Sequence, residues 1–140
     1  MDNNRPIILI TNDDGYEADG ITQLTEVARQ HGKVVIVAPE QQQSGKSCAI
    51  THSVPLTMRL VSESDDITIY ACNGTPVDCV KLSLYTLFRE RRPDLVISGI
   101  NHGSNASVNA VYSGTVGAAV EGCVNKISSI NLSKNKKLEV

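Results

Sequence analysis

The sequence predicts an α/β fold in which helices flank a mostly parallel sheet. Residues 6–11, 33–38 and 94–98 are short apolar runs rich in β-branched side chains, which are typical of strands buried on both faces. A segment with helical spacing separates the first two runs, and this strand–helix–strand order implies a right-handed parallel crossover. Polar clusters follow the runs, at the sheet edge where α/β proteins usually bind ligands.

The first half of the chain predicts a helix, a strand and a hairpin after the opening strand. The helix opens at Asp19 and Gly20 and ends near His31 and Gly32. Its apolar residues fall at helical spacing: Ile21, Leu24, Val27 and Ala28. Pro39 is expected to stop the second strand. Residues 49–62 and 66–71 are extended segments joined by a polar turn, which predicts a β-hairpin at the sheet margin.

The second half predicts two more helices and a last strand. Thr75-Pro76-Val77-Asp78 is a capping box with proline at the first helical position, and its helix is expected to run to about Arg91. The apolar stripe of this helix consists of Val80, Leu84, Leu87 and Phe88. A helix of small residues is expected from Gly114 to about Val124, capped by Ser113, and residues 127–132 form the final strand.

Composition narrows the classes of function. A chain of 140 residues predicts one domain, and its net charge of −2 gives no support for a nucleic-acid surface. No secretory signal and no membrane-length apolar segment are present, so a cytoplasmic location is expected. The four cysteines show neither C-x-x-C nor zinc-like spacing, which indicates free thiols in a reducing compartment.

The cluster Asn12-Asp13-Asp14-Gly15 is the first candidate for chemistry. Both carboxylates can reach one site only after the strand has ended, and Gly15 supplies the backbone freedom for that turn. Two such close like charges favour a cation or one raised pKa. Carboxylate, Ser and Asn oxygens suit Mg²⁺ or Mn²⁺. The alternative is a solvated Asx-type turn, since Asn, Asp and Gly cluster in turns.

A second cluster, Gly45-Lys46-Ser47, is similar to the end of a phosphate-binding P-loop. The first glycine of that pattern would stand at position 40, which is Glu40. A carboxylate there would face the phosphates, and residues 49–53 are extended instead of helical. We therefore reject a P-loop and interpret Ser44 as an oxygen ligand on a loop.

Two further polar clusters follow later in the chain. In the first, Asn101 is able to offer a carbonyl oxygen to a metal and Asn105 an amide to a phosphate, with an ordinary polar loop as the alternative. His102 is either a general base or an exposed bystander. In the second, Ser113-Gly114-Thr115 opens a helix whose unpaired amides would bind an anion, unless the segment is simply a well-capped helix start.

The order of these clusters along the chain is more specific than any one of them. Together they resemble the SurE family, stationary-phase survival proteins that act as metal-dependent nucleoside monophosphate phosphatases. The resemblance extends from about Ile7 to about Val124. It is carried by Asn12-Asp13-Asp14-Gly15, by Ala38-Pro39 with Ser44-Gly45, by residues 74–80 (GTPVDCV), by residues 93–101 (PDLVISGIN) and by residues 112–119 (YSGTVGAA).

The resemblance implies a Rossmann-like, mostly parallel sheet flanked by helices, with a projecting β-hairpin extension, and assembly as dimers or tetramers. It implies one divalent metal ion per subunit, Mg²⁺ or Mn²⁺. The metal ligands that it implies are Asp13, Asp14, Ser44 and Asn101, of which Asp13 and Asn101 are the catalytic candidates. The phosphate-side pocket that it implies consists of Asn105, Ser113, Gly114 and Thr115.

The chain also departs from the SurE pattern. Family members are longer and continue into a C-terminal region that contributes to oligomer contacts and closes the active site. Their strand after the last helix normally begins with Gly-[Ile/Val]-Pro, where this chain has Lys126-Ile127-Ser128. We therefore expect residues 1–140 to form a single SurE-like domain that lacks the C-terminal part of the family fold.

The function expected from these observations is metal-dependent hydrolysis of nucleoside 5′- or 3′-monophosphates, a 5′-nucleotidase activity. A catalytically impaired remnant that binds metal and nucleotide without turnover is one alternative, because catalysis needs a closed geometry. A receiver-like signalling domain is another, but the strand that ends in Ser98-Gly99 lacks the phosphoacceptor aspartate. Nucleic acid and membranes are not expected as partners.

Overall fold

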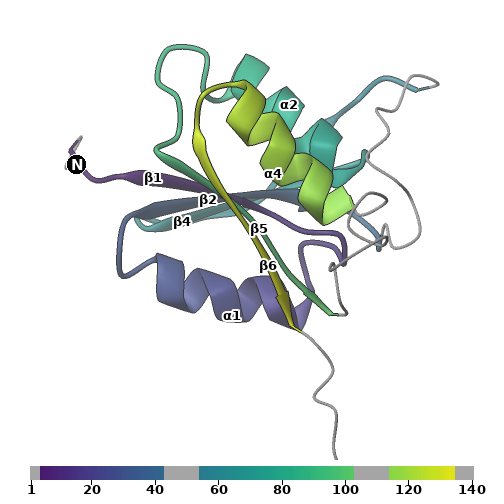
Figure 1. Cartoon of the computed structure of the whole chain (residues 1–140), viewed down its shortest axis with the longest axis horizontal. Helices are drawn as coiled ribbons and strands as arrows, with labels where there is room; N and C mark the ends of the chain where they lie inside the picture. Colours follow the sequence, from purple (N-terminus) through teal and green to yellow (C-terminus); the bar gives the residue numbers. More distant parts are fainter. Residues whose placement is uncertain (1–3, 43–53, 103–113, 135–140) are drawn as a thin grey trace, which may run out of the picture.

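The computed structural model describes residues 4–42, 54–102 and 114–134, which form one sheet with helices on both faces (Figure 1). In chain order the elements are β1 (Ile7–Thr11), α1 (Asp19–Ala28), β2 (Lys33–Pro39), β3 (Met58–Glu63), β4 (Ile67–Cys72), α2 (Pro76–Thr86), β5 (Leu95–His102), α4 (Gly114–Val124) and β6 (Ser128–Lys134). This arrangement confirms the α/β class predicted from the sequence.

The order of the strands makes β1 the point where the winding of the sheet reverses. The six-stranded sheet runs β3-β4-β2-β1-β5-β6, and neighbours are parallel except β3 and β4, which form the predicted hairpin at the sheet margin. From β1 the chain first builds toward β2 and β4, and it then returns to place β5 on the other side of β1. The carboxyl ends of β1 and β5 therefore flank the point where the winding reverses, the usual ligand position in such sheets.

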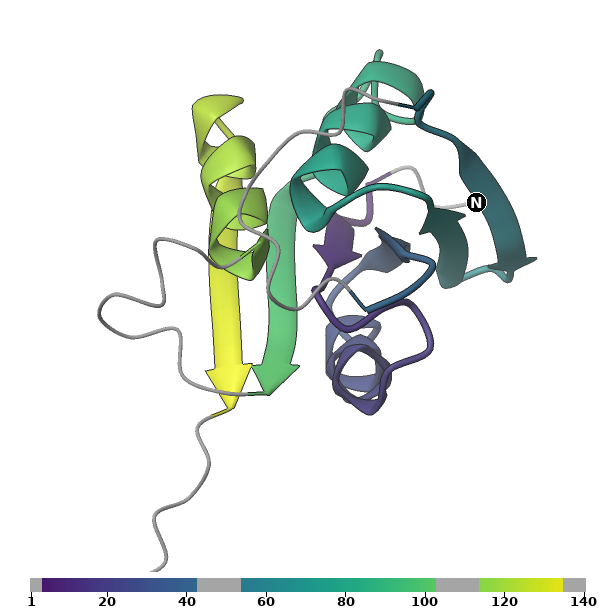
Figure 2. The ribbon, with the colours of Figure 1, turned by 90° about the vertical axis from the view of Figure 1, so that its right-hand side faces the viewer.

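The central strand β1 is apolar because both of its faces are covered. Its side chains alternate in direction, so Leu9 enters the core shared with α2 and α4 while Ile8 and Ile10 enter the core shared with α1. Figure 2 shows α1 on one side of β1 and α2 on the other. Complete burial of the Leu9 side chain contributes about 2 kcal/mol to stability.

Two helices end earlier than the apolar pattern predicts. After α1, the His31 N–H donates to the Ala28 carbonyl at 2.9 Å, a tighter turn that ends the helix before His31. The second helix stops at Thr86 instead of about Arg91. Beyond it, the Phe88 N–H donates to the Ser83 carbonyl at 3.0 Å, five residues back. This wider turn brings Phe88 into the core, whereas Leu87, predicted on the same stripe, is 37% exposed.

The strand boundaries also differ from the predicted ones. Only the last part of residues 49–62 forms a strand, since β3 starts at Met58, and residues 43–53 lie outside the described ranges. The predicted strand over residues 94–98 continues as β5 to His102 because Asn101 and His102 pair with Ser133 and Lys134 of β6, past an irregularity after Ser98. The cluster Ser98–Asn101 thus lies within a strand and not after it.

Two sequence expectations concern the molecule as a whole. Among the described residues, no helix combines the length and the apolar character needed to cross a bilayer. Cys72, Cys79 and Cys123 carry free thiols, as predicted, while Cys48 falls in a part of the chain that the structure does not describe.

The capping box of α2 is formed as the sequence predicts, and it provides a stability test. The Thr75 hydroxyl accepts from the Asp78 N–H at 3.3 Å, and the Asp78 carboxylate accepts from the Thr75 N–H at 2.9 Å, both in buried surroundings. Thr75→Ala should lower the free energy of unfolding in urea by about 1–2 kcal/mol. Thr22→Ala on exposed α1 is the control and should cost about 0.5 kcal/mol or less. Equal losses in the two variants would show that the buried cap adds nothing.

Candidate metal and phosphate site

The loop after β1 is held by the side chain of Asn12. Its amide donates to the Gly15 carbonyl at 2.8 Å, and its oxygen accepts from the Gly15 N–H at 3.1 Å. Gly15 has a φ of 106°, a backbone conformation that other residues rarely adopt. The Tyr16 N–H then donates to the Pro39 carbonyl at 3.1 Å and ties the loop to the end of β2. The turn therefore fixes the two residues it encloses, Asp13 and Asp14.

Asp13 is a buried carboxylate without an adequate partner. Its side chain is 5% exposed, and Asp13 Oδ1 and Asp14 Oδ2 are buried with no hydrogen bond. Burial, and then the neighbouring Asp14 charge, raise the pKa of Asp13 from 3.8 to about 6, and the nearby Thr115 hydroxyl partly opposes the rise. Such oxygens are satisfied by a bound cation, so the donor chemistry fits a hard divalent metal ion.

The donor set is poor in charged ligands. The described part of the chain holds no group of three or more His, Cys, Asp or Glu side chains arranged for a metal. An ion at Asp13 and Asp14 would therefore complete its shell with neutral oxygens, from amide or hydroxyl side chains and from water. Mg²⁺ and Mn²⁺ accept such a shell readily, because they bind through one or two carboxylates and keep several waters.

The first turn of α4 packs directly against Asp13. A Cβ atom added to Gly114 would lie 2.7 Å from Asp13 Oδ1 and 3.3 Å from the Pro76 ring at the start of α2. Thr115, the next residue of α4, is fully buried and has an unpartnered hydroxyl. The first turn of α4 thus lies beside the carboxylate, and the partial positive charge of a helix N-terminus faces it. A helix N-terminus in this position is chemically suited to an anion such as a phosphate.

Asn101 lies at the same end of the sheet. Register pairs Thr11 with Ser98 across β1 and β5, and Asn101 follows three residues later, half-buried on β5. Between them the strand is irregular, with Gly99 at a φ of 144° and a cis peptide bond from Gly99 to Ile100. The topology therefore brings Asn101 and Asp13 to the carboxyl ends of neighbouring strands.

Three of the predicted site residues, Ser44, Asn105 and Ser113, lie outside the described residues, as does the P-loop-like segment that was rejected. The described members of the predicted site are Asp13, Asp14, Asn101, Gly114 and Thr115. Of these, the contacts bring Asp13, Asp14, Gly114 and Thr115 together. His102, weighed as a general base, is the last residue of β5.

Three polar residues at this edge are absent from the site that the sequence predicts. Asn12 is fully buried and braces the acidic turn, and the glycine three residues after the asparagine is the signal that indicates it. The hydroxyls of Thr11 and Ser98 are buried, unpartnered and opposite each other in the register of β1 and β5. No local pattern predicts these two, because their pairing depends on strands that are far apart in sequence.

Comparison with known proteins decides the family. The model of the family described as "Survival protein SurE" matches residues 8–139. The chain belongs to the SurE family. A SurE relative from Porphyromonas gingivalis, named 5′-nucleotidase SurE, is 49% identical over 133 residues, which cover 95% of this chain and 52% of the relative. One of the same name from Phocaeicola vulgatus is 51% identical, with 95% and 51% covered.

A solved SurE structure agrees with the fold. The crystal structure of the SurE protein from Aquifex aeolicus matches with a TM-score of 0.83 and 41% identity, over 96% of this chain and 53% of that one. The chain thus spans about half the length of the SurE relatives that it matches. Membership of the SurE family confirms the resemblance based on the ordered motifs, and the structural match confirms the SurE-like α/β architecture.

Proposed function

We propose that this chain acts as a divalent-metal-dependent phosphomonoesterase that hydrolyses nucleoside 5′- and 3′-monophosphates to nucleoside and phosphate. The observation that carries the proposal is the pair of buried, unpartnered carboxylate oxygens on Asp13 and Asp14 where the winding of the sheet reverses. The name 5′-nucleotidase, which the curated SurE relatives bear, supports the substrate class.

The proposed cofactor is one divalent ion per subunit, Mg²⁺ or Mn²⁺, held by Asp13, Asp14, Ser44 and Asn101. When bound, such an ion polarises a phosphoryl oxygen and lowers the pKa of a coordinated water toward 7. The carboxylates supply the negative charge that offsets the ion, and Asn101 supplies a neutral oxygen. We assign the catalytic role to Asp13 and Asn101 because both would touch the ion beside the reacting phosphate.

The phosphate side of the proposed site lies at the start of α4. Gly114 and Thr115 are proposed to meet the phosphoryl oxygens, together with Asn105 and Ser113. The amides of the first turn are fixed in place by the helix before substrate arrives, so they can stabilise developing charge without reorganising. Gly114 has no Cβ, which leaves room for Asp13 to approach this turn.

The direct test is phosphate release from AMP and GMP with Mn²⁺ or Mg²⁺, compared with the same reaction in EDTA. The proposal is supported if phosphate release requires the metal and its rate is proportional to the protein concentration. Release that persists unchanged in EDTA would contradict it. Calorimetry that detects nucleotide binding without any phosphate release would instead indicate a binding protein that does not turn over.

Assembly and location belong to the same proposal. A homodimer or homotetramer in the cytoplasm, acting on nucleoside monophosphates and on neither nucleic acid nor membranes, is the expected setting. Sedimentation equilibrium measures the assembly directly, and a purely monomeric protein at high concentration would contradict that part. Retention on a nucleic-acid column at physiological salt would contradict the expected absence of a nucleic-acid partner.

Metal binding should depend on pH with a definite sign. Because the pKa of Asp13 is raised to about 6 in the metal-free protein, a proton competes with the ion below that pH. The affinity for Mn²⁺ should fall by about tenfold per pH unit below pH 6 and level off above it. Calorimetric titrations from pH 5 to pH 8 measure this, with Asp19→Asn as a control that leaves the profile unchanged. A flat profile across this range would exclude Asp13 as a ligand.

A further inference from the structure

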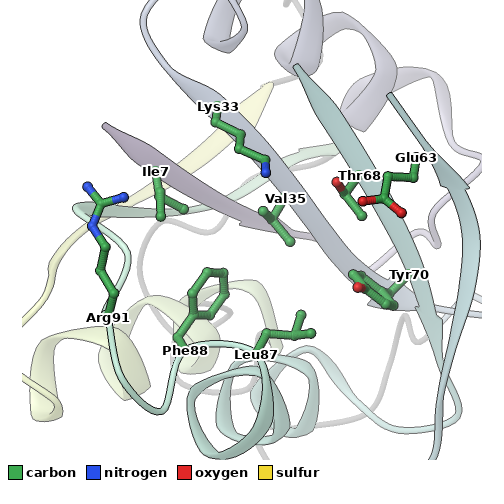
Figure 3. A pocket seen from close by; sticks show the side chains of 9 residues that line it. All are labelled: Ile7, Lys33, Val35, Glu63, Thr68, Tyr70, Leu87, Phe88 and Arg91. Atoms are coloured by element: carbon green, nitrogen blue, oxygen red, sulfur yellow. The ribbon is translucent and has the colours of Figure 1, made fainter. Parts of the chain in front are cut away.

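A cavity of about 260 Å³ lies at the end of the sheet opposite to Asp13 (Figure 3). It is bounded by Ile7 and Lys33, the first residues of β1 and β2, and by Phe88 in the turn after α2. The cavity exists because α2 ends at Thr86 and leaves the first residues of these strands uncovered. None of its lining residues belongs to the proposed catalytic site.

The cavity has an apolar floor. Phe88 and Val35 are buried at its base, Ile7 and the Tyr70 ring are partly buried beside them, and Leu87 stands at the rim. Figure 3 shows the Phe88 ring and Leu87 facing the strands across this space. Water gains little by hydrating such a surface, so a ligand with an apolar or aromatic body is favoured.

One side of the cavity is cationic. Lys33 extends along the cavity (Figure 3), and within the described part of the chain its ammonium makes no ion pair or hydrogen bond. Arg91 stands near Ile7, held by the Asp94 carboxylate at 3.3 Å and by the Arg5 carbonyl at 3.4 Å. Asp94 itself accepts from the Ile7 N–H at 2.8 Å, so this carboxylate is occupied by the strand and by Arg91. Lys33 is therefore the available partner for an anion.

The opposite side presents acceptors and hydroxyls. Glu63 on β3 points into the cavity beside Thr68 and Tyr70 of β4, and the register places Glu63 directly across from Thr68. Since β3, β4 and β2 are consecutive in the sheet, Glu63 and Lys33 stand on strands separated by about 10 Å of backbone spacing. An anion and a hydrogen-bond donor are thus favoured at opposite ends of one ligand.

We propose that this cavity binds a small aromatic monocarboxylate with a hydroxyl or amino group across the ring from the carboxylate. The carboxylate pairs with Lys33, the ring lies on Phe88 and Leu87, and the donor bonds to Glu63. The volume is near the lower end of ligand pockets, roughly 300–1,000 Å³, which limits the ligand to about one ring. Glu63 disfavours a polyanion such as a nucleotide, and inorganic phosphate would leave the apolar floor unused.

The test is calorimetric titration of 4-hydroxybenzoate into the full chain. A ligand of this size predicts a dissociation constant on the order of 0.1–1 mM. Lys33→Met keeps the aliphatic stem and removes the charge, so it should weaken binding by about fivefold or more. Lys81→Met on α2 removes a lysine outside the cavity and should leave binding unchanged. Mn²⁺ titrations of both variants should match the parent protein, which separates this site from the carboxylate pair.

Two related ligands separate the contribution of the hydrogen-bond donor to affinity from that of the carboxylate. Benzoate lacks the donor and should bind about threefold to tenfold more weakly, and Glu63→Met, which has no oxygen acceptor, should abolish that difference. 4-Hydroxybenzyl alcohol lacks the charge and should bind as weakly to the parent as 4-hydroxybenzoate binds to Lys33→Met. No binding at about 5 mM, or equal binding to the parent and Lys33→Met, would overturn the proposal.

Discussion

Asp13→Asn is expected to reduce the rate of metal-dependent phosphate release by on the order of 10²-fold or more. The same substitution is expected to stabilise the metal-free protein. The raised pKa means that folded Asp13 holds a proton more tightly than unfolded Asp13 does. Metal-free stability should therefore fall as the pH rises from 3.8 to about 6, and remain at the lower level above that range. The neutral amide of asparagine removes the cost of a buried charge. We therefore expect the substitution to raise the free energy of unfolding of the metal-free protein by about 1–2 kcal/mol at pH 8.

The measurement is urea unfolding in EDTA at pH 8, together with Mn²⁺ titration of the same samples. Asp19→Asn is the matched control, because Asp19 is an exposed aspartate in the first turn of α1. It should change neither stability nor Mn²⁺ affinity appreciably. If Asp13→Asn instead loses stability and keeps its Mn²⁺ affinity, the carboxylate is structural and the metal assignment is wrong. The titration remains informative even when no phosphate release is detected in the parent.

Gly114→Ala is expected to destabilise the protein although alanine favours helices. The added Cβ would meet Asp13 Oδ1 at 2.7 Å, closer than such atoms normally approach, and the Pro76 ring at 3.3 Å. Relief of this contact requires that the Asp13 carboxylate rotates or that α4 moves, and because the carboxylate is buried we expect a cost of about 1–2 kcal/mol. Displacement of Asp13 should also weaken Mn²⁺ binding by about tenfold.

The control for this variant is Val120→Ala, on the same helix but 54% exposed. It should change the free energy of unfolding by no more than about 0.5 kcal/mol. Both variants are compared by urea unfolding and by Mn²⁺ titration. A Gly114→Ala protein as stable as the parent, with unchanged Mn²⁺ affinity, would show that α4 does not pack against the acidic turn in solution.

The elements that the sequence predicts well are those with strong local signals. Apolar runs locate β1 and β2, and the Thr75 capping box locates the start of α2. The predicted end of α2, at about Arg91, is wrong because Leu87 continues the helical spacing. Only the packing of Phe88 against the sheet decides where the helix stops. The cavity beside Phe88 follows from that ending, so no sequence pattern predicts it.

The candidate site also combines features that the sequence predicts with features that only the structure shows. The acidic pair and Asn101 stand in recognisable motifs, and the metal hypothesis follows from their residue types. The burial that shifts the pKa of Asp13 comes from contacts that include the first turn of α4, about a hundred residues later in the chain. Its magnitude therefore requires the three-dimensional structure. Sequence alone gives the repulsion between Asp13 and Asp14, which is the smaller cause of the shift.

The position of β1 between β2 and β5 has a consequence for how the protein forms during synthesis. Ile8 pairs with Val34 early, but its second partner, Leu95, leaves the ribosome much later. Non-local pairing of this kind slows folding, and β1 remains an open edge until β5 arrives. Asp13 is not enclosed until α4 has also emerged, so we expect the proposed metal site to form only after α4 has been translated.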